Sequence, residues 1–420
     1  MNLPKIGILS LGCPRNLVDS ESILSRLSFK KYPIVDIAKA DIAIVNTCAF
    51  IDEAKKESID AILDLIDLKK QGRLKRIIVY GCLVGRYKEA LIKELPQIDA
   101  FVGTISLKYE NRTFSLVPRH YAYLKICEGC IHKCSYCAIP NIKPHFMSLD
   151  IETVLKKVEV FSKNKLSELN IIGQDISGYG IDLYAKKALP KLLKKIVHKA
   201  KNIGWLRLLY LYPNGITNEL LDLIAGEPKI CKYIDLPIQH INNRILKLMN
   251  RHTSRKAILG LLDKIRKKIP DAAIRTSIIV GFPSETDREF QELLTFLKNA
   301  RFERLGAFIY SREEGTPACN FKKQISRNIK LARFNALMSQ QQAVSCQVNR
   351  SLQGKVIDVL IDEKEKDSFY LGRSQHDAPE VDGLVYVNSQ KKLKPGAFIK
   401  ARITGTMEYD LLGENIYEYS

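Results

Sequence analysis

The sequence lacks any long uninterrupted apolar run, although 46% of its 420 residues are hydrophobic. A membrane-spanning helix needs roughly 20 consecutive apolar residues, so we expect no membrane span. The first twenty residues, MNLPKIGILSLGCPRNLVDS, turn polar soon after a short apolar run, which argues against a secretory signal peptide. Low-complexity segments and obvious repeats are also missing. We therefore expect a cytoplasmic protein, and its length predicts two or three domains.

Cysteine, in contrast, is plentiful, with ten residues. A disulfide framework is unexpected in a large chain without a secretory signal, because cytosolic thiols are kept reduced. The sequence therefore favours metal ligation or redox chemistry.

The net charge of +20 suggests a polyanionic partner or surface. Residues 121–350 carry 38 basic and 20 acidic side chains, whereas residues 351–420 carry 9 basic and 12 acidic ones. The basic character therefore belongs to the middle of the chain, and the carboxyl-terminal part is slightly acidic.

Three β-branched apolar runs open the chain and alternate with stretches of helical periodicity, which predicts a βαβαβ unit with a parallel sheet. The runs are KIGILSLG (5–12), IAIVNT (42–47) and RIIVYG (76–81), and each ends at a cysteine: Cys13, Cys48 and Cys82. Parallel strands finish at one edge of a sheet, where open α/β folds place their ligands. We therefore expect these three thiols to meet in space.

From about residue 121 the alternation has a longer rhythm and includes six strand-like runs. Six βα units predict an incomplete barrel with its site at the carboxyl ends of the strands. Ser284 is the expected cap of the helix before the last unit. The runs are 123–127, 169–174, 205–213, 232–239, 273–282 and 304–311.

A final helix, at about 325–349, leads to short strands separated by Gly, Pro, Asp and Asn, of which NIYEYS (415–420) is the last. This texture predicts a small antiparallel barrel. The expected domains are therefore 1–118, 119–349 and 350–420, all within an α/β multidomain protein.

The strongest local signal is Cys130-x3-Cys134-x2-Cys137, just after the first barrel strand. Three thiolates can hold three irons of a 4Fe-4S cube, whose normal complement is four cysteines, and so leave one iron open. An open iron can chelate the amino and carboxylate groups of S-adenosylmethionine. A zinc knuckle is the alternative, because Cys127 completes two CxxC pairs. The position at the top of the first barrel strand favours the cluster.

Cys13, Cys48 and Cys82 could each be buried structural cysteines, since free cysteine is among the most buried residue types. Their recurrence at three strand ends favours a shared metal site, again with three ligands. The other cysteines follow no such pattern, and we expect structural roles for Cys231, Cys319 and Cys346.

Gly173, Gln174 and Asp175 end the second barrel strand, where a polar group could meet the ammonium of the cofactor, although the same triplet is typical of a helix-capping turn. Trp205, Tyr210 and Tyr212 are more typical of a core than of base stacking, and His240 of a satisfied structural histidine.

Motifs along the whole chain make it similar to the radical SAM methylthiotransferases, and within them to the RimO-type enzymes that modify a ribosomal protein. The motifs are SLGCPRNLVDSES, VNTCAFIDEAKKESI, YGCLVGRY, EGCIHKCSYCAIP, IIGQDISGYG, LRLLYLYP, IDLPIQHI, IIVGFPSET, EEGTPA and GRSQHDAPEVDG. This resemblance implies an amino-terminal cluster domain, a radical SAM barrel and a carboxyl-terminal TRAM barrel.

The resemblance also implies two 4Fe-4S clusters, the radical-generating one on Cys130, Cys134 and Cys137 and an auxiliary one on the other triad. One S-adenosylmethionine would yield a 5′-deoxyadenosyl radical that takes a hydrogen from the β-carbon of an aspartate in ribosomal protein twelve of the small subunit. Sulfur associated with the auxiliary cluster would fill the vacancy, and a second S-adenosylmethionine would supply the methyl group. An electron donor such as flavodoxin or ferredoxin is implied.

Two segments depart from the pattern that such enzymes show. Residues 141–148, NIKPHFMS, replace an arginine-glycine pair and a further arginine, and only Lys143 keeps a cation. Cys127 replaces a serine and adds a thiol that could compete during cluster assembly.

Two other functions stay open at this point. A transfer-RNA adenosine methylthiotransferase of the MiaB type should have a basic last barrel for RNA, whereas here the barrel is acidic and suits a basic ribosomal protein, with docking expected through Asp377, Glu380 and Asp382. The basic middle of the chain favours RNA, although ribosomal RNA beside the target would account for it. A zinc-stabilised RNA-binding protein without catalysis is the remaining alternative.

Overall fold

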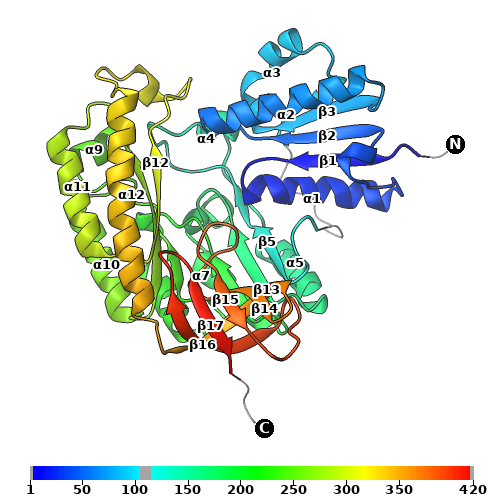
Figure 1. Ribbon diagram of the computed structural model, residues 1–420. Helices are drawn as coiled ribbons and strands as arrows, with labels where there is room; N and C mark the ends of the chain where they lie inside the picture. Colours follow the sequence, from blue (N-terminus) through cyan, green and yellow to red (C-terminus); the bar gives the residue numbers. More distant parts are fainter. Residues whose placement is uncertain (1–2, 105–114, 417–420) are drawn as a thin grey trace.

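The computed structural model describes residues 3–104 and 115–416, which form three lobes (Figure 1). The amino-terminal lobe lies beside the upper end of a central barrel, and a small carboxyl-terminal barrel covers the lower end. Within the described residues, no helix is long and apolar enough to cross a membrane.

The amino-terminal lobe is a parallel sheet with helices on it, as the hydrophobic runs predict. Its strands lie in the order β1 (Ile6–Ser10), β2 (Ile42–Thr47), β3 (Arg76–Gly81) and β4 (Ala100–Val102). The helices are α1 (Pro14–Phe29), α2 (Asp52–Lys70) and α3 (Cys82–Glu94). The fourth strand has three residues, too few to show a period in the sequence.

The central lobe contains six parallel strands in two hydrogen-bonded sets, β5-β8-β9 and β10-β11-β12, and it confirms the six predicted units. The strands are β5 (Tyr121–Lys125), β8 (Glu168–Ile172), β9 (Trp205–Leu208), β10 (Tyr233–Asp235), β11 (Ala273–Val280) and β12 (Arg304–Ile309). Several are shorter than their apolar runs. The predicted strand 205–213 stops early because Tyr210 has a φ of +65°, which a strand cannot contain.

Helices cover the outside of this barrel and bury one apolar face each against the strands (Figure 1). The longer ones are α5 (Ile151–Lys163), α7 (Leu189–Lys199), α8 (Asn218–Gly226), α10 (Arg255–Lys268), α11 (Asp287–Ala300) and α12 (Arg327–Arg350). Short elements lie in the loops: β6 (Cys127–Glu128), α4 (Ile139–Ile142), β7 (Met147–Ser148), α6 (Ile181–Tyr184) and α9 (Asn243–Leu248).

The cap of α11 differs from the prediction. Thr286 is the cap and forms a capping box with Glu289, whereas Ser284 lies outside the helix with a φ of +64°. A capping residue needs an extended backbone, which Ser284 does not have.

The carboxyl-terminal lobe is a closed five-stranded barrel in the order β13-β14-β15-β17-β16. Four of its pairs are antiparallel, but β15 and β17 are parallel. An odd number of strands cannot alternate around a closed ring, so one parallel pair is unavoidable. The strands are β13 (Val356–Lys366), β14 (Phe369–Ser374), β15 (Val385–Asn388), β16 (Phe398–Thr406) and β17 (Leu411–Asn415). The last strand thus ends at Asn415, where the predicted segment 415–420 begins, and residues 417–420 lie outside the described residues.

Buried ion pairs join this lobe to the central barrel. Glu168 of β8 lies between Arg207, at 2.7 Å, and Arg373 of β14, at 2.6 Å, and all three side chains are at most 2% exposed. Burial alone would raise the pKa of Glu168, but the two guanidinium charges outweigh burial and hold that pKa below its ordinary value. The ionised carboxylate therefore ties the two lobes together.

The same interface corrects the expected docking residues. Asp377 pairs with Arg304 at 2.5 Å, and Asp382 accepts a hydrogen bond from the Tyr233 hydroxyl at 2.5 Å. Their side chains are 2% and 4% exposed. Glu380 is exposed but accepts a hydrogen bond from the Tyr121 hydroxyl. The prediction that Asp377 and Asp382 face a partner protein is wrong, because both are buried against the central barrel, whereas the side chain of Glu380 remains exposed.

Candidate functional site

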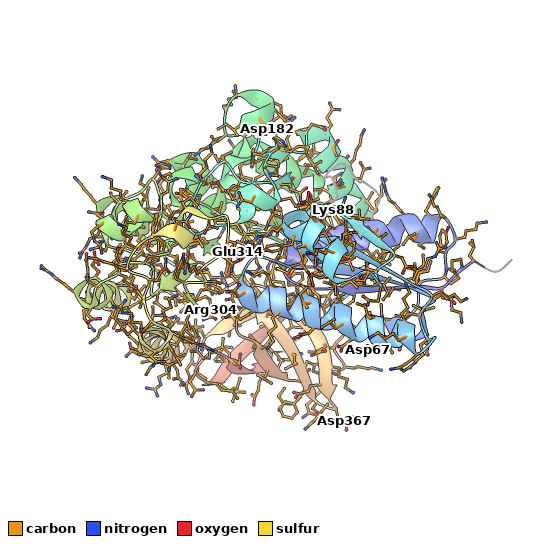
Figure 2. The ribbon with its side chains drawn as sticks, turned by 90° about the horizontal axis from the view of Figure 1, so that it is seen from above. Asp67, Lys88, Asp182, Arg304, Glu314 and Asp367 are labelled. Carbon is orange, nitrogen blue, oxygen red and sulfur yellow. The ribbon has the colours of Figure 1, made fainter. Side chains whose placement is uncertain are left out.

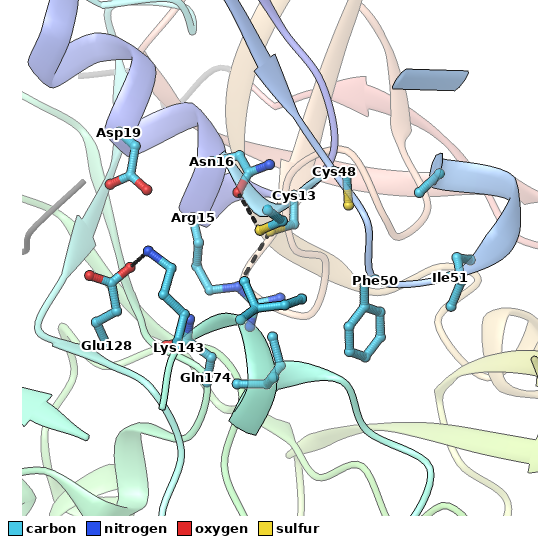
Figure 3. Close-up of a pocket in the computed structure, with 14 residues that line it drawn as sticks. Cys13, Arg15, Asn16, Asp19, Cys48, Phe50, Ile51, Glu128, Lys143 and Gln174 are labelled. Carbon is cyan, nitrogen blue, oxygen red and sulfur yellow. Dashed lines mark hydrogen bonds and ion pairs between the residues drawn. The ribbon is translucent and has the colours of Figure 1, made fainter. Parts of the chain in front are cut away.

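The first cysteine triad lies where the strand pattern predicts it. Cys13, Cys48 and Cys82 follow the first three strands and line one cavity of about 160 Å³ (Figure 3). Residues of the central barrel complete its wall, among them Lys143 and Gln174. The cavity therefore lies between the two lobes.

Two glycines allow this close approach of the three segments. Gly12 has a φ of +87°, and a Cβ there would lie 2.7 Å from the Cβ of Cys48. Gly81 has a φ of +105°, and a Cβ there would lie 2.5 Å from the side-chain oxygen of Asn46. Any larger residue would be strained by its backbone and would collide with its neighbour.

Arg15 distinguishes the three thiols electrostatically. Its Nε donates to the Cys13 sulfur at 3.4 Å. Burial raises the pKa of Cys13, but the charge and hydrogen bond of Arg15 outweigh burial, so that pKa lies below its ordinary value. Burial raises the pKa of Cys48, and it raises the pKa of Cys82 to about 12. Cys13 is therefore the thiol of this triad that ionises most readily.

The second triad lies on the loop between β6 and α4. Cys137 donates its backbone N–H to the Cys134 carbonyl at 3.1 Å, and His132 donates its backbone N–H to the Cys130 sulfur at 3.4 Å. Burial, with a smaller contribution from the neighbouring thiols of the loop, raises the pKa of Cys130 and of Cys137 to about 12. The three sulfurs therefore lie within electrostatic reach of one another.

Each triad offers three thiols, which is the donor set that can hold three irons of a 4Fe-4S cube. In residues 3–104 and 115–416, no three His, Cys, Asp or Glu side chains converge closely enough to hold one metal ion. A zinc ion would need four ligands at about 2.0–2.3 Å. Ligands of a cluster each take a different iron and lie further apart.

Cys127 takes no part in this loop. It is fully buried, and its sulfur donates to the Asp175 carbonyl at 3.6 Å. A Cβ on Gly173 would lie 2.5 Å from that sulfur. Cys127 therefore packs under the end of β8, which argues against its use as a zinc ligand.

The triplet after β8 divides between two roles. Asp175 accepts hydrogen bonds from the backbone and hydroxyl of Ser177, at 2.9 and 2.5 Å, and its other oxygen lies 3.0 Å from His132 Nε2. Gln174 instead lines the cavity, and its side-chain oxygen is buried without a hydrogen-bond partner in the described part of the chain. The capping turn is therefore present, and Gln174 is the member that faces the cavity.

The aromatic residues and the histidine are structural, as their sequence context favours. Trp205 packs edge-on against Phe398, and His240 is buried beside Glu285, accepting the backbone N–H of Asn242. Tyr212, however, stacks on His132 with ring centroids 3.6 Å apart. It therefore supports the loop of the second triad.

A chain of buried charges crosses the boundary between the lobes beside the cavity (Figure 3). Lys125 lies 2.5 Å from Asp19 of α1 and 3.3 Å from Glu128, which also pairs with Lys143. Lys143 is the one cation retained in the atypical segment 141–148. It faces the first triad, from the barrel side of the cavity.

Sequence reasoning missed Arg15 and this charge chain. Arg15 donates to the Gly173 carbonyl at 3.1 Å, across 158 positions of sequence, and its guanidinium lies 4.6 Å from the ring centroid of Tyr210. Its place two residues after a strand-end cysteine was the only local signal.

Comparisons with known proteins agree with this organisation. Residues 5–103 match the uncharacterized protein family UPF0004, residues 124–297 the radical SAM superfamily, and residues 354–416 the TRAM domain.

Among solved structures, the radical S-adenosylmethionine methyltransferase TsrM from Kitasatospora setae, with tryptophan and a SAM analog bound, is 12% identical with a TM-score of 0.54. The match covers 82% of this chain and 89% of that one. It supports the fold alone.

Full-length relatives are much more similar. The ribosomal protein uS12 methylthiotransferase RimO of Clostridioides difficile is 44% identical, with 99% of each chain covered. The proteins of the same name from Thermoanaerobacter sp. and Caldanaerobacter subterraneus are 45% and 46% identical, over 98% and 97% of this chain and 100% and 99% of theirs. With this identity over nearly its whole length, the chain belongs to the RimO family of radical SAM methylthiotransferases.

Proposed function

We propose that this chain methylthiolates the β-carbon of an aspartate in ribosomal protein uS12. The observation that carries the proposal is the cavity in which three strand-end cysteines face residues of the central barrel. This arrangement supports a sulfur-bearing site next to the lobe with the radical SAM motif. The similar relatives named for this activity support it.

In this proposal Cys130, Cys134 and Cys137 hold one 4Fe-4S cluster, and Cys13, Cys48 and Cys82 hold a second. When bound, the clusters and S-adenosylmethionine supply the radical, the sulfur and the methyl group. The three thiols around the cavity suit such a group, because each thiolate can bind a different iron of one cluster.

The protein side chains position and shield these groups. Arg15 orients the Cys13 thiolate, and Gly12 and Gly81 let the ligand segments approach. Gln174 offers an unpaired acceptor to a donor in the cavity, which makes it the stronger cofactor-binding candidate of the triplet Gly173, Gln174 and Asp175. Asp175 would act indirectly, by holding His132.

The partners follow from the chemistry and the charge. We infer uS12 as substrate, with nearby ribosomal RNA facing the basic middle of the chain. A one-electron donor such as flavodoxin or ferredoxin would reduce the cluster. These partners stay proposals.

Mass spectrometry of uS12 tests the function directly. The purified, reconstituted protein is given S-adenosylmethionine, a reductant and either small ribosomal subunits or transfer RNA. We expect a methylthio group on one aspartate of uS12 and no change in transfer RNA. Methylthiolated transfer RNA with unmodified uS12 would replace this proposal by the MiaB-type function.

A further inference from the structure

A buried carboxylate in the loop after β12 holds the amino-terminal lobe. Glu313 has a side chain only 2% exposed. It lies 2.9 Å from Arg86 of α3 and 3.1 Å from Lys55 of α2, and it accepts the Ser311 hydroxyl at 2.6 Å. We call these four residues the Glu313 clasp. It joins the loop that ends the central barrel to two helices of the other lobe.

Arg86 connects the clasp to the first cysteine triad. It lies one helical turn after Cys82, and its guanidinium donates to the carbonyl of Ala49, the residue after Cys48, at 2.6 Å. The same guanidinium donates to the Glu314 carbonyl at 2.9 Å. One planar fork, 4% exposed, therefore binds a cysteine-bearing segment and the barrel loop together.

A separate contact holds α1 of the same lobe. Glu21 of α1 accepts the backbone N–H of Leu116, just before the first barrel strand, at 2.9 Å. Viewed from above, Glu314 lies by the end of α2 opposite to Asp67 (Figure 2). The α1 side is therefore held close to the point where the chain enters the barrel, and the α2 and α3 side is held by the clasp.

We propose that Glu313 is a positioning residue for sulfur insertion: through Arg86 and Lys55 it keeps Cys48 and Cys82 against the mouth of the barrel. The inference rests on the proposed function. Cleavage of S-adenosylmethionine needs the second triad, which belongs to the barrel itself. Loss of the clasp therefore separates cleavage from insertion.

The test compares Glu313→Gln with Glu314→Gln, a neighbouring glutamate whose side chain is exposed. Both reconstituted variants should form 5′-deoxyadenosine within about twofold of the parent rate. The ratio of methylthiolated uS12 to 5′-deoxyadenosine should fall at least tenfold in Glu313→Gln alone. Electron paramagnetic resonance of the reduced protein, without substrate, should show weaker magnetic interaction between the two clusters in that variant.

Equal product ratios and equal spectra in the two variants overturn the proposal, and so does a parallel loss of cleavage and product in Glu313→Gln. If Glu313→Gln does not fold, Arg86→Lys replaces it, because lysine keeps the charge but has a single nitrogen, which cannot reach the Ala49 carbonyl and the Glu314 carbonyl from two arms as the guanidinium does. In Arg86→Lys the ratio of methylthiolated uS12 to 5′-deoxyadenosine should be lower than in the parent and in Glu314→Gln, but above zero. A ratio equal to that of the parent contradicts the proposal. Failure of the parent to modify uS12 refutes the proposed function, while the spectra still test the clasp.

Discussion

The cysteines differ in their surroundings, which divide them into two triads and a group of isolated cysteines. Cys13, Cys48 and Cys82 share a cavity at the lobe boundary. Cys130, Cys134 and Cys137 share a loop of the barrel. Cys346 lies on α12, away from both triads in the sequence and in the fold. The two sets should therefore fail in different ways when one member is removed.

Cys134→Ala should abolish reductive cleavage of S-adenosylmethionine, because the proposed cofactor-binding cluster would lose a ligand. Cys48→Ala should keep cleavage and lose the methylthiolated product. Cys346→Ala is the matched control, and it should keep both the cleavage of S-adenosylmethionine and the methylthiolated product. The measurement is 5′-deoxyadenosine and modified uS12 from the same reaction. Loss of cleavage in a folded Cys48→Ala protein that still holds the barrel cluster contradicts this division.

At the level of strands and helices, predictions succeeded where the order of elements along the chain determines which residues meet. The strand-end cysteines were predictable because parallel strands end at one edge, so that chain order alone brings them together. Contacts such as the hydrogen bond from Arg15 to Gly173 were not predictable from the sequence, because they depend on how the two lobes pack against each other. The acidic residues of 377–382 show the same limit. Their charge is visible in the sequence, but which face of the lobe becomes an interface is decided by tertiary packing.

The cap of α11 gives a test at the level of one element. Thr286→Ala should lower the free energy of unfolding by about 1 kcal/mol, because the hydroxyl accepts the backbone N–H of Glu289 in a capping box. Ser284→Ala should have a smaller effect, since Ser284 lies outside the helix and its hydroxyl meets only the exposed Arg244 side chain. Urea unfolding of the two variants provides the comparison. A larger loss in Ser284→Ala would restore the cap expected from the sequence.

On the proposed two-cluster assignment, the iron content of the whole molecule follows from its two cysteine triads. Anaerobically reconstituted protein should hold about eight irons and eight sulfides, because each 4Fe-4S cube contributes four of each. Replacing all three cysteines of either triad by alanine should halve both numbers. Iron and sulfide assays, with zinc measured as the control, test this expectation. Saturation at four irons with both triads intact would refute the two-cluster proposal.

The buried ions between the two barrels should make the assembly of the lobes depend on pH. Glu168, Asp362 and Asp377 all have pKa values below their ordinary ones, in each case because facing cations outweigh the burial that would raise them. Carboxylates of this kind stabilise the folded state above their unfolded pKa, about 4, and the stabilisation is lost as the pH falls through the folded pKa. At pH 7 the network should therefore be at full strength.

Glu168→Gln should cost about 3–5 kcal/mol at pH 7, because it leaves Arg207 and Arg373 buried without their shared counter-charge. Glu219→Gln is the matched control: that glutamate is 60% exposed and pairs with Lys194 at the surface, so its loss should cost under about 1 kcal/mol. Thermal unfolding of the two variants and the parent between pH 7 and pH 3 measures both effects. The gap between the parent and Glu168→Gln should narrow as the pH falls, since protonation removes the same charge from the parent. A gap that stays constant down to pH 3 would mean that the carboxylate contributes through packing and not through its charge.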